Sequence, residues 1–139
     1  VLGAVSVPTL HITSVDDTIN LPGYRSTVED RLVVFNAMRE SQKTLAVFNT
    51  GGHSIFTDRT TRSGPEVSAR IKNATCELCT IFLRESFSEV FEETKELGFA
   101  EPAPVDRITS SEPSTKQWLA KHSDLVYRFV TPSEYQTSG

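Results

Sequence analysis

The sequence predicts an α/β fold, because a strand, a helix and a second strand follow one another within residues 5–49. Residues 5–13 form a short apolar run opened by Pro8, and proline is tolerated at the start of a strand. Residues 43–49 are apolar without alternation, which is typical of a parallel strand covered on both faces. With a helix between the two strands, the segment makes a βαβ unit with a right-handed crossover.

The helix of this unit is predicted to run from Ser26 to about Glu40. Ser26 and Glu29 form a capping-box pattern, in which each side chain satisfies a free amide at the start of the helix. Apolar residues then recur on one side: Val28, Leu32 and Phe35, flanked by Val33, Val34 and Met38. Residues 14–18 and 20–23, between the first strand and the helix, have the composition of turns and loops.

A long helix is predicted after the second strand. Ser63 to Glu66 opens it, with Pro65 in the first turn, and residues 85–97 either continue it or form a separate helix. Its apolar residues recur at helical spacing: Val67, Ile71, Ala74, Leu78, Ile81 and Phe82. Gly98 is the expected stop.

The rest of the chain is predicted to be a loop and a terminal helix. Residues 99–114 hold three of the seven prolines and several serines, which is typical of a loop or tether. Residues 114–117 form a second capping-box pattern and open a helix expected from Lys116 to Val130. We therefore divide the chain into a first portion, 1–98, the loop 99–114, and a terminal helix with its tail, 115–139.

Composition excludes two classes of partner. The 139 residues carry a net charge of -4, so no electrostatic footprint for nucleic acid or an anionic membrane is expected. No run of about 18 apolar residues occurs, so no membrane span is expected. The chain begins at Val1 rather than methionine, which indicates a trimmed or partial chain and leaves its cellular location unknown.

The two cysteines, Cys76 and Cys79, have the spacing of half a zinc ribbon or of a redox pair. No second pair and no histidine-rich segment accompanies them, and they fall inside a predicted helix. We interpret them as helix-packing residues, with a disulfide or a metal site as the alternatives. No metal or organic cofactor is expected.

Candidate catalytic residues follow the two predicted parallel strands. Asp16 and Asp17 follow the first strand, and His53 follows the second after Gly51 and Gly52. Functional groups gather at the carboxyl ends of parallel strands, and neighbouring strands lie about 4.8 Å apart. An aspartate and a histidine at such ends can meet, and a buried aspartate on an imidazole is the acid–base half of a nucleophile–base–acid triad.

These motifs resemble the carboxyl-terminal part of an α/β-hydrolase, of the dienelactone-hydrolase-like and acetylesterase-like branch. The resemblance rests on residues 8–17, 21–24 and 43–59. It extends from residue 5 to about 85, and weakly over 118–129. It implies a partial α/β-hydrolase fold in which this chain supplies the last parallel strands and flanking helices.

In that family the triad order is Ser, Asp, His, with the acid in Gly-x-x-Asp and the base in Gly-x-His. Ser14-Val-Asp-Asp17 matches the acid motif with serine in place of glycine, and Gly52-His53 matches the base motif. The resemblance thus implies Asp17 as the acid, with Asp16 as the alternative, and His53 as the general base.

The nucleophile motif Gly-x-Ser-x-Gly is absent from the chain. Ser14 and Ser54 are nearby hydroxyls, but neither is predicted on a strand-to-helix elbow. The first hypothesis is that the chain supplies acid and base to a serine ester hydrolase acting on a small ester, with the serine on a missing amino-terminal segment or a second chain. The alternative is a non-catalytic hydrolase remnant that associates through an open strand edge.

Overall fold

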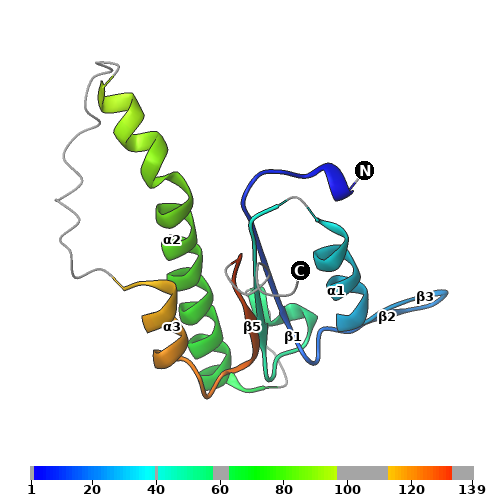
Figure 1. Cartoon of the computed structure of the whole chain (residues 1–139). Coiled ribbons are helices and arrows are strands. Elements are labelled where there is room, and N and C mark those ends of the chain that lie inside the picture. The colour runs from blue at the N-terminus through cyan, green and yellow to red at the C-terminus, as the bar shows by residue number, and fades with distance from the viewer. Residues whose placement is uncertain (1, 40, 58–62, 97–112, 133–139) are drawn as a thin grey trace.

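The computed structural model describes residues 2–39, 41–57, 63–96 and 113–132. Its centre is a three-stranded mixed sheet in the order β1-β4-β5, with β1 at Thr9–Ser14, β4 at Lys43–Phe48 and β5 at Val126–Val130. Helix α1 (Val28–Ala37) lies on one side of the sheet, and α2 (Pro65–Glu96) and α3 (Thr115–Lys121) lie on the other (Figure 1). The fold is therefore a small α/β arrangement in three layers.

The predicted strand–helix–strand unit is present. β1 and β4 pair in parallel, with Thr9 opposite Lys43 and Ser14 opposite Phe48, so the two strands end side by side. Every residue of β4 is buried, which explains its unbroken apolar run. Its side chains alternate between the layers: Leu45 and Val47 pack toward α1, whereas Ala46 and Phe48 pack toward α2 and α3.

The entry to α1 differs from the prediction in two respects. The segment predicted as loop is a short hairpin, β2 (Ile19–Leu21) and β3 (Tyr24–Ser26), which turns at Gly23 with φ +79°. The capping box lies one residue later than predicted, because Thr27 is the cap and Asp30, not Glu29, returns the bond. Ser26 is drawn into the hairpin instead, where its hydroxyl accepts a hydrogen bond from Arg31.

The single terminal helix predicted over 116–130 is wrong. The segment forms the short helix α3, ends it at His122, and then becomes β5, which pairs antiparallel with β4. The β-branched and aromatic residues Val126-Tyr-Arg-Phe-Val130 favour a strand, and an open edge of β4 was available to pair with it. The capping box at Ser114 and Gln117 is present as predicted.

Helix α2 continues without a break to Glu96, and Pro65 occupies its first turn as predicted. Its buried face carries Ile71, Ala74, Leu78 and Ile81, which pack with Trp118 of α3 in the larger core cluster. The predicted stop at Gly98 and almost all of the predicted tether fall outside the described residues.

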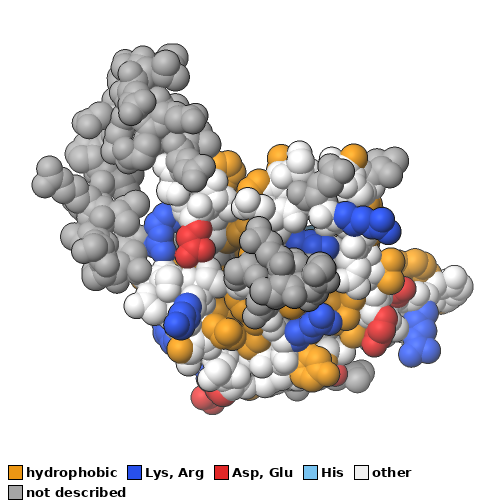
Figure 2. Space-filling model, viewed as in Figure 1, with side chains coloured by type: hydrophobic (Ala, Val, Ile, Leu, Met, Phe, Trp, Pro, Cys, Tyr) orange, Lys and Arg blue, Asp and Glu red, His pale blue; other side chains and the backbone are white. Residues whose placement is uncertain are grey.

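The cysteines of α2 are both free thiols; Cys76 is exposed and Cys79 partly buried, so the prediction of helix packing is wrong for Cys76. Burial raises the pKa of the Cys79 thiol, and the charge of the neighbouring Cys76 raises it further. Within the described ranges no His, Cys, Asp and Glu side chains converge as metal ligands do, and no helix is long and apolar enough to cross a membrane. Figure 2 shows basic side chains scattered over the visible face rather than gathered in one patch.

Candidate functional site: an aspartate–histidine pair at the carboxyl ends of two parallel strands

The candidate site forms where β1 and β4 end. After β1, the amide of Asp17 donates to the Ser14 carbonyl in a tight turn, which brings the Asp17 side chain back over the strand ends. After β4, the chain passes through two glycines into a short 3-10 helix, η2 (His53–Phe56). Because the strands end in register, Asp17 and His53 meet although 36 residues separate them.

The His53 ring contacts Asp17 through its Nδ1 atom, which lies 2.8 Å from Asp17 Oδ1. The Asp17 side chain is buried, with 7% of its surface exposed, whereas the His53 side chain is 56% exposed. A hydrogen bond between Nδ1–H and the carboxylate fixes the tautomer in which Nε2 carries the free lone pair. Asp17 is the only partner of the His53 ring within the described residues.

Two further residues hold the Asp17 carboxylate. Thr13 donates its hydroxyl to Oδ2 at 2.8 Å, and Arg31 from α1 reaches both oxygens, Nε to Oδ2 and Nη2 to Oδ1, at 3.3 Å. Burial alone raises the pKa of Asp17, but hydrogen bonds from Thr13, His53 and Arg31, together with the charge of Arg31, lower it overall. The carboxylate is therefore ionised and fixed in position.

The loop that carries His53 depends on Gly51. Its φ of +108° lies in the region that favours glycine, and a Cβ there would lie 2.8 Å from the Ile55 side chain. Gly52 has an ordinary φ of -70°, and a Cβ there would meet nothing closer than 3.9 Å. Of the two glycines that the sequence analysis treated alike, only Gly51 is required by the backbone.

No hydroxyl in the described residues lies in hydrogen-bond contact with the His53 ring. Ser14 is completely buried and donates to the Gly51 carbonyl, so it ties the two loops together and cannot reach a substrate. Ser54 lies in η2 next to His53, and no strand-to-helix elbow presents it. The described residues thus hold a histidine–aspartate pair with no hydroxyl nucleophile in contact with it.

Of the two candidate acids, Asp17 is the one in contact with His53, and the Asp16 side chain is exposed. Arg31 and Thr13 also bind the Asp17 carboxylate, and no sequence motif identifies either of them. Thr13 lies on the strand four residues before Asp17, and Arg31 lies one turn into α1.

A second histidine–carboxylate pair lies away from this site. His122 Nε2 lies 2.8 Å from Glu77 Oε2, and the His122 ring packs against Trp118 with centroids 5.3 Å apart. Although helix α3 is short and partly exposed, His122 is not on a solvated face: it is buried at the end of α3. The third histidine, His11, is partly buried in β1, edge-on to Phe35.

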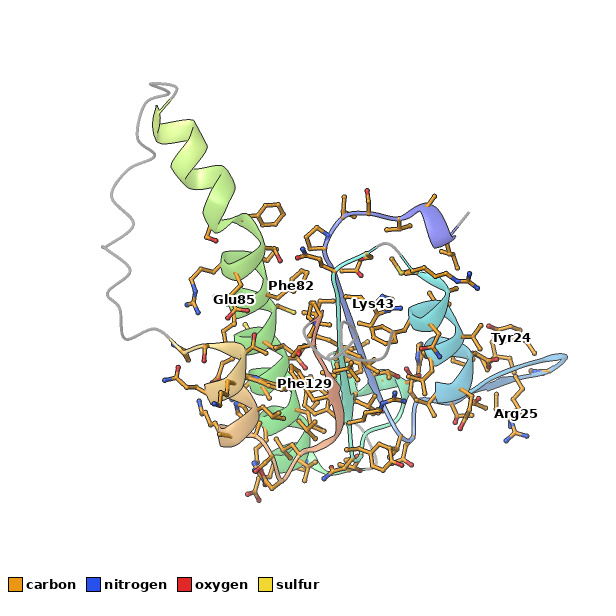
Figure 3. The ribbon with its side chains drawn as sticks, viewed as in Figure 1. Tyr24, Arg25, Lys43, Phe82, Glu85 and Phe129 are labelled. Atoms are coloured by element: carbon orange, nitrogen blue, oxygen red, sulfur yellow. The ribbon has the colours of Figure 1, made fainter. Side chains whose placement is uncertain are left out.

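A cavity of about 470 Å³ lies at the opposite, amino-terminal end of the strands, between α2, α3 and β5. Pro8 and Thr44 mark that end, and Phe82 and Glu85 of α2 and Phe129 of β5, labelled in Figure 3, line the cavity. Both carboxylate oxygens of Glu85 accept from Thr115, so they tie α3 to α2. The cavity is thus separate from the Asp17–His53 pair, in which the His53 ring is exposed at the surface.

Comparisons of the chain with protein-family models, with curated proteins and with solved structures find no match for it. The Asp17–His53 pair and its surroundings are the features of the molecule that bear on function.

Proposed function

We propose that this chain supplies the acid and the base of a Ser-Asp-His triad in a serine ester hydrolase of the α/β-hydrolase type. The serine would come from a segment outside these 139 residues or from a second chain. The observation that carries the proposal is the pairing of a buried, fully hydrogen-bonded Asp17 carboxylate with the Nδ1 atom of an exposed His53 ring. That arrangement leaves Nε2 free on the accessible side of the pair.

The chemistry would proceed in two steps. Nε2 of His53 accepts the proton of the serine hydroxyl as the serine oxygen attacks the ester carbonyl, and the imidazolium then protonates the departing alcohol. A water molecule repeats the sequence on the acyl-enzyme, releasing the carboxylic acid and restoring the serine. Asp17 remains ionised throughout and stabilises the imidazolium that forms in each step.

Three features of the pair support this role over that of a structural contact. The carboxylate has donors on both oxygens, so it cannot turn away from the ring when the ring moves a proton. The base is the exposed partner and the acid the buried one, as a base that meets a substrate requires. The pair also lies at the carboxyl ends of parallel strands, where α/β folds place their functional groups.

The proposal is tested with an added alcohol in place of the missing serine. The chain is mixed with p-nitrophenyl acetate and increasing millimolar trifluoroethanol, and the formation of trifluoroethyl acetate is followed by gas chromatography. If His53 is a competent base, it removes the alcohol proton and the ester accumulates about tenfold faster than with His53→Ala. Asp17→Asn should lose most of this difference because the tautomer is no longer fixed.

The matched control is His122→Ala, which removes a histidine that also contacts a carboxylate but is buried. It should leave the alcohol-dependent rate unchanged. Equal rates for the wild-type chain and His53→Ala would overturn the assignment of the base. A fluorophosphonate adduct on the chain alone, measured by intact mass, would place the nucleophile inside these residues and overturn the shared-site arrangement.

A further inference from the structure

Strand β1 leaves one edge of the sheet open. Among the strands of the described residues it is the outermost, whereas β4 is paired on both sides. The amides of Thr9 and Val15 donate to the carbonyls of Gln42 and Phe48, so the odd-numbered backbone groups of β1 face β4. The backbone groups of Leu10 and Ile12 therefore face outward, and within the described residues neither has a partner.

Between Thr9 and Ser14 this edge has no charged side chain and no bulge that would oppose pairing. The strand Thr9-Leu-His-Ile-Thr-Ser14 contains no lysine, glutamate, aspartate or proline, and it has no bulge in its pairing with β4. Leu10 and Ile12 add partly buried apolar side chains on the α2 side. An edge of this kind is a template for another strand.

Two irregularities on the edge indicate which strand fits. Pro8 has no N–H to donate outward. The outward carbonyl of Ser14 already accepts from the amide of Asp17 at 3.0 Å. The edge thus lacks a donor at Pro8, and its acceptor at Ser14 is already occupied. These two positions each lie three residues from His11.

A second copy of β1, running antiparallel about a twofold axis at His11, places these two irregularities opposite each other. Leu10 then faces Ile12 of the second copy, and each pair exchanges both backbone hydrogen bonds. Pro8 faces Ser14 of the second copy, where the Ser14 amide donates to the Pro8 carbonyl. The only hydrogen bond missing from this ladder would run from Pro8, which has no N–H, to the Ser14 carbonyl, which already accepts from the amide of Asp17.

We propose that two copies of this chain pair along β1 in this register, joining two three-stranded sheets into one continuous six-stranded sheet. The interface is isologous, since each copy presents the same edge. Leu10 and Ile12 form apolar cross-strand pairs on one side, and Thr9 faces Thr13 on the other. A strand in another register or direction leaves a carbonyl opposite Pro8 without a donor.

The two Asp17–His53 pairs lie at opposite ends of the joined strands, so neither copy completes the site of the other. The pairing does not depend on the proposed function and is tested separately, and it competes with any serine-bearing segment that would add a strand to β1.

The first test compares Ile12→Pro with Ile12→Ala. Both variants lose the isoleucine side chain, but only proline loses the outward amide, and neither change touches a bond to β4. In sedimentation equilibrium over a concentration series, the average mass of the wild-type chain and of Ile12→Ala should rise from 15.4 kDa toward twice that value. Ile12→Pro should stay at the mass of one chain. Wild-type chain at one mass throughout, or equal association of the two variants, would overturn the proposal.

If Ile12→Pro fails to fold, amide hydrogen exchange of the wild-type chain replaces it. The amides of Leu10, Ile12 and Ser14 should gain at least tenfold protection as concentration rises, while that of Asn49, which bonds to Leu125 within the chain, should not change. Equal exchange of the outward amides at low and high concentration would contradict the pairing.

The register is tested by disulfide cross-linking in a Cys76→Ser/Cys79→Ser background. His11→Cys places a thiol on the twofold axis, in a non-hydrogen-bonded pair where the two Cα atoms lie about 4.5 Å apart, so mild oxidation should link the copies. The matched control Thr9→Cys separates the two thiols by roughly 13 Å along the strands and should not link. Stronger linking of the control would show another register and overturn the axis at His11.

Discussion

His53–Asp17 and His122–Glu77 are two histidine–carboxylate pairs with the same 2.8 Å separation but opposite burial. In the first pair the carboxylate is 7% exposed and the ring 56% exposed. In the second pair the ring is 11% exposed and the carboxylate 40% exposed. Distance alone therefore does not separate a candidate base from a structural contact.

The surroundings explain the difference. Asp17 is held by Thr13 and Arg31, so the fixed partner is the acid and the ring is presented to the surface. His122 is held by Trp118, so the fixed partner is the ring, and the exposed Glu77 is shared with Lys121. The first arrangement suits proton transfer to a substrate, and the second suits the joining of α3 to α2.

The largest expected effect comes from removing the buried charge. Asp17→Asn replaces one accepting oxygen by an NH₂ group, which leaves donors from Thr13, His53 and Arg31 without a full set of acceptors. We expect a loss of about 3 kcal/mol in the free energy of unfolding, measured by urea denaturation. Glu77→Gln at the exposed carboxylate should cost less than about 1 kcal/mol. Equal losses would mean that burial does not distinguish the two pairs.

A second large effect is expected in the loop that presents His53. Gly51→Ala forces a positive φ on alanine and a contact with Ile55, and should cost about 2 kcal/mol. Gly52→Ala should cost less than about 0.5 kcal/mol because its backbone is extended and the space is open. Thermal unfolding of the two variants measures this difference, and a larger loss for Gly52→Ala would contradict the backbone assignment.

The sequence was informative where local signals and chain direction agree. The βαβ unit followed from two apolar runs and the spacing between them, and contact between the strand ends followed from parallel pairing. Contact of His53 with Asp16 or Asp17 could therefore be predicted from the sequence, and the resemblance to the hydrolase acid motif favoured Asp17, which is the residue in contact. The catalytic role of the two residues stays a prediction.

The sequence was misleading where a distant partner decides the structure. The residues of Val126–Val130 favour a strand, but a five-residue segment directly after a helix is a strand only if a partner is available, and that partner is the distant edge of β4. The burial of His122 follows from that choice, because the chain turns back at the end of α3. Arg31 of α1 contacts both Asp17 and Ser26 of the β2–β3 hairpin, whose six strand residues carry no long alternating pattern in the sequence.

The next prediction separates the two histidines by stability rather than by activity. His122→Ala removes a buried ring from Trp118 and should cost about 2 kcal/mol. His53→Ala removes an exposed ring, and Arg31 still satisfies the carboxylate, so its cost should stay below about 1 kcal/mol. Urea denaturation followed by Trp118 fluorescence measures both, and the emission should change in the folded state only for His122→Ala. A folded-state change in His53→Ala would indicate that the two sites communicate.

The smallest effect is the acid dependence of stability. The folded-state pKa of Asp17 is lowered: burial opposes this, but the bonds from Thr13, His53 and Arg31 outweigh it. Stability from Asp17 is therefore fully present above its unfolded pKa of about 3.9 and is lost as pH falls through the folded value. Hydrogen bonds from Lys121 and His122 also lower the pKa of Glu77, but that exposed carboxylate is screened by solvent and contributes less. Urea denaturation between about pH 5 and pH 2 should thus show a shallower loss of stability for Asp17→Asn than for Glu77→Gln. The reverse order would mean that Glu77 contributes more to the acid dependence of stability than Asp17, and that burial does not strengthen the hydrogen bonds to the Asp17 carboxylate.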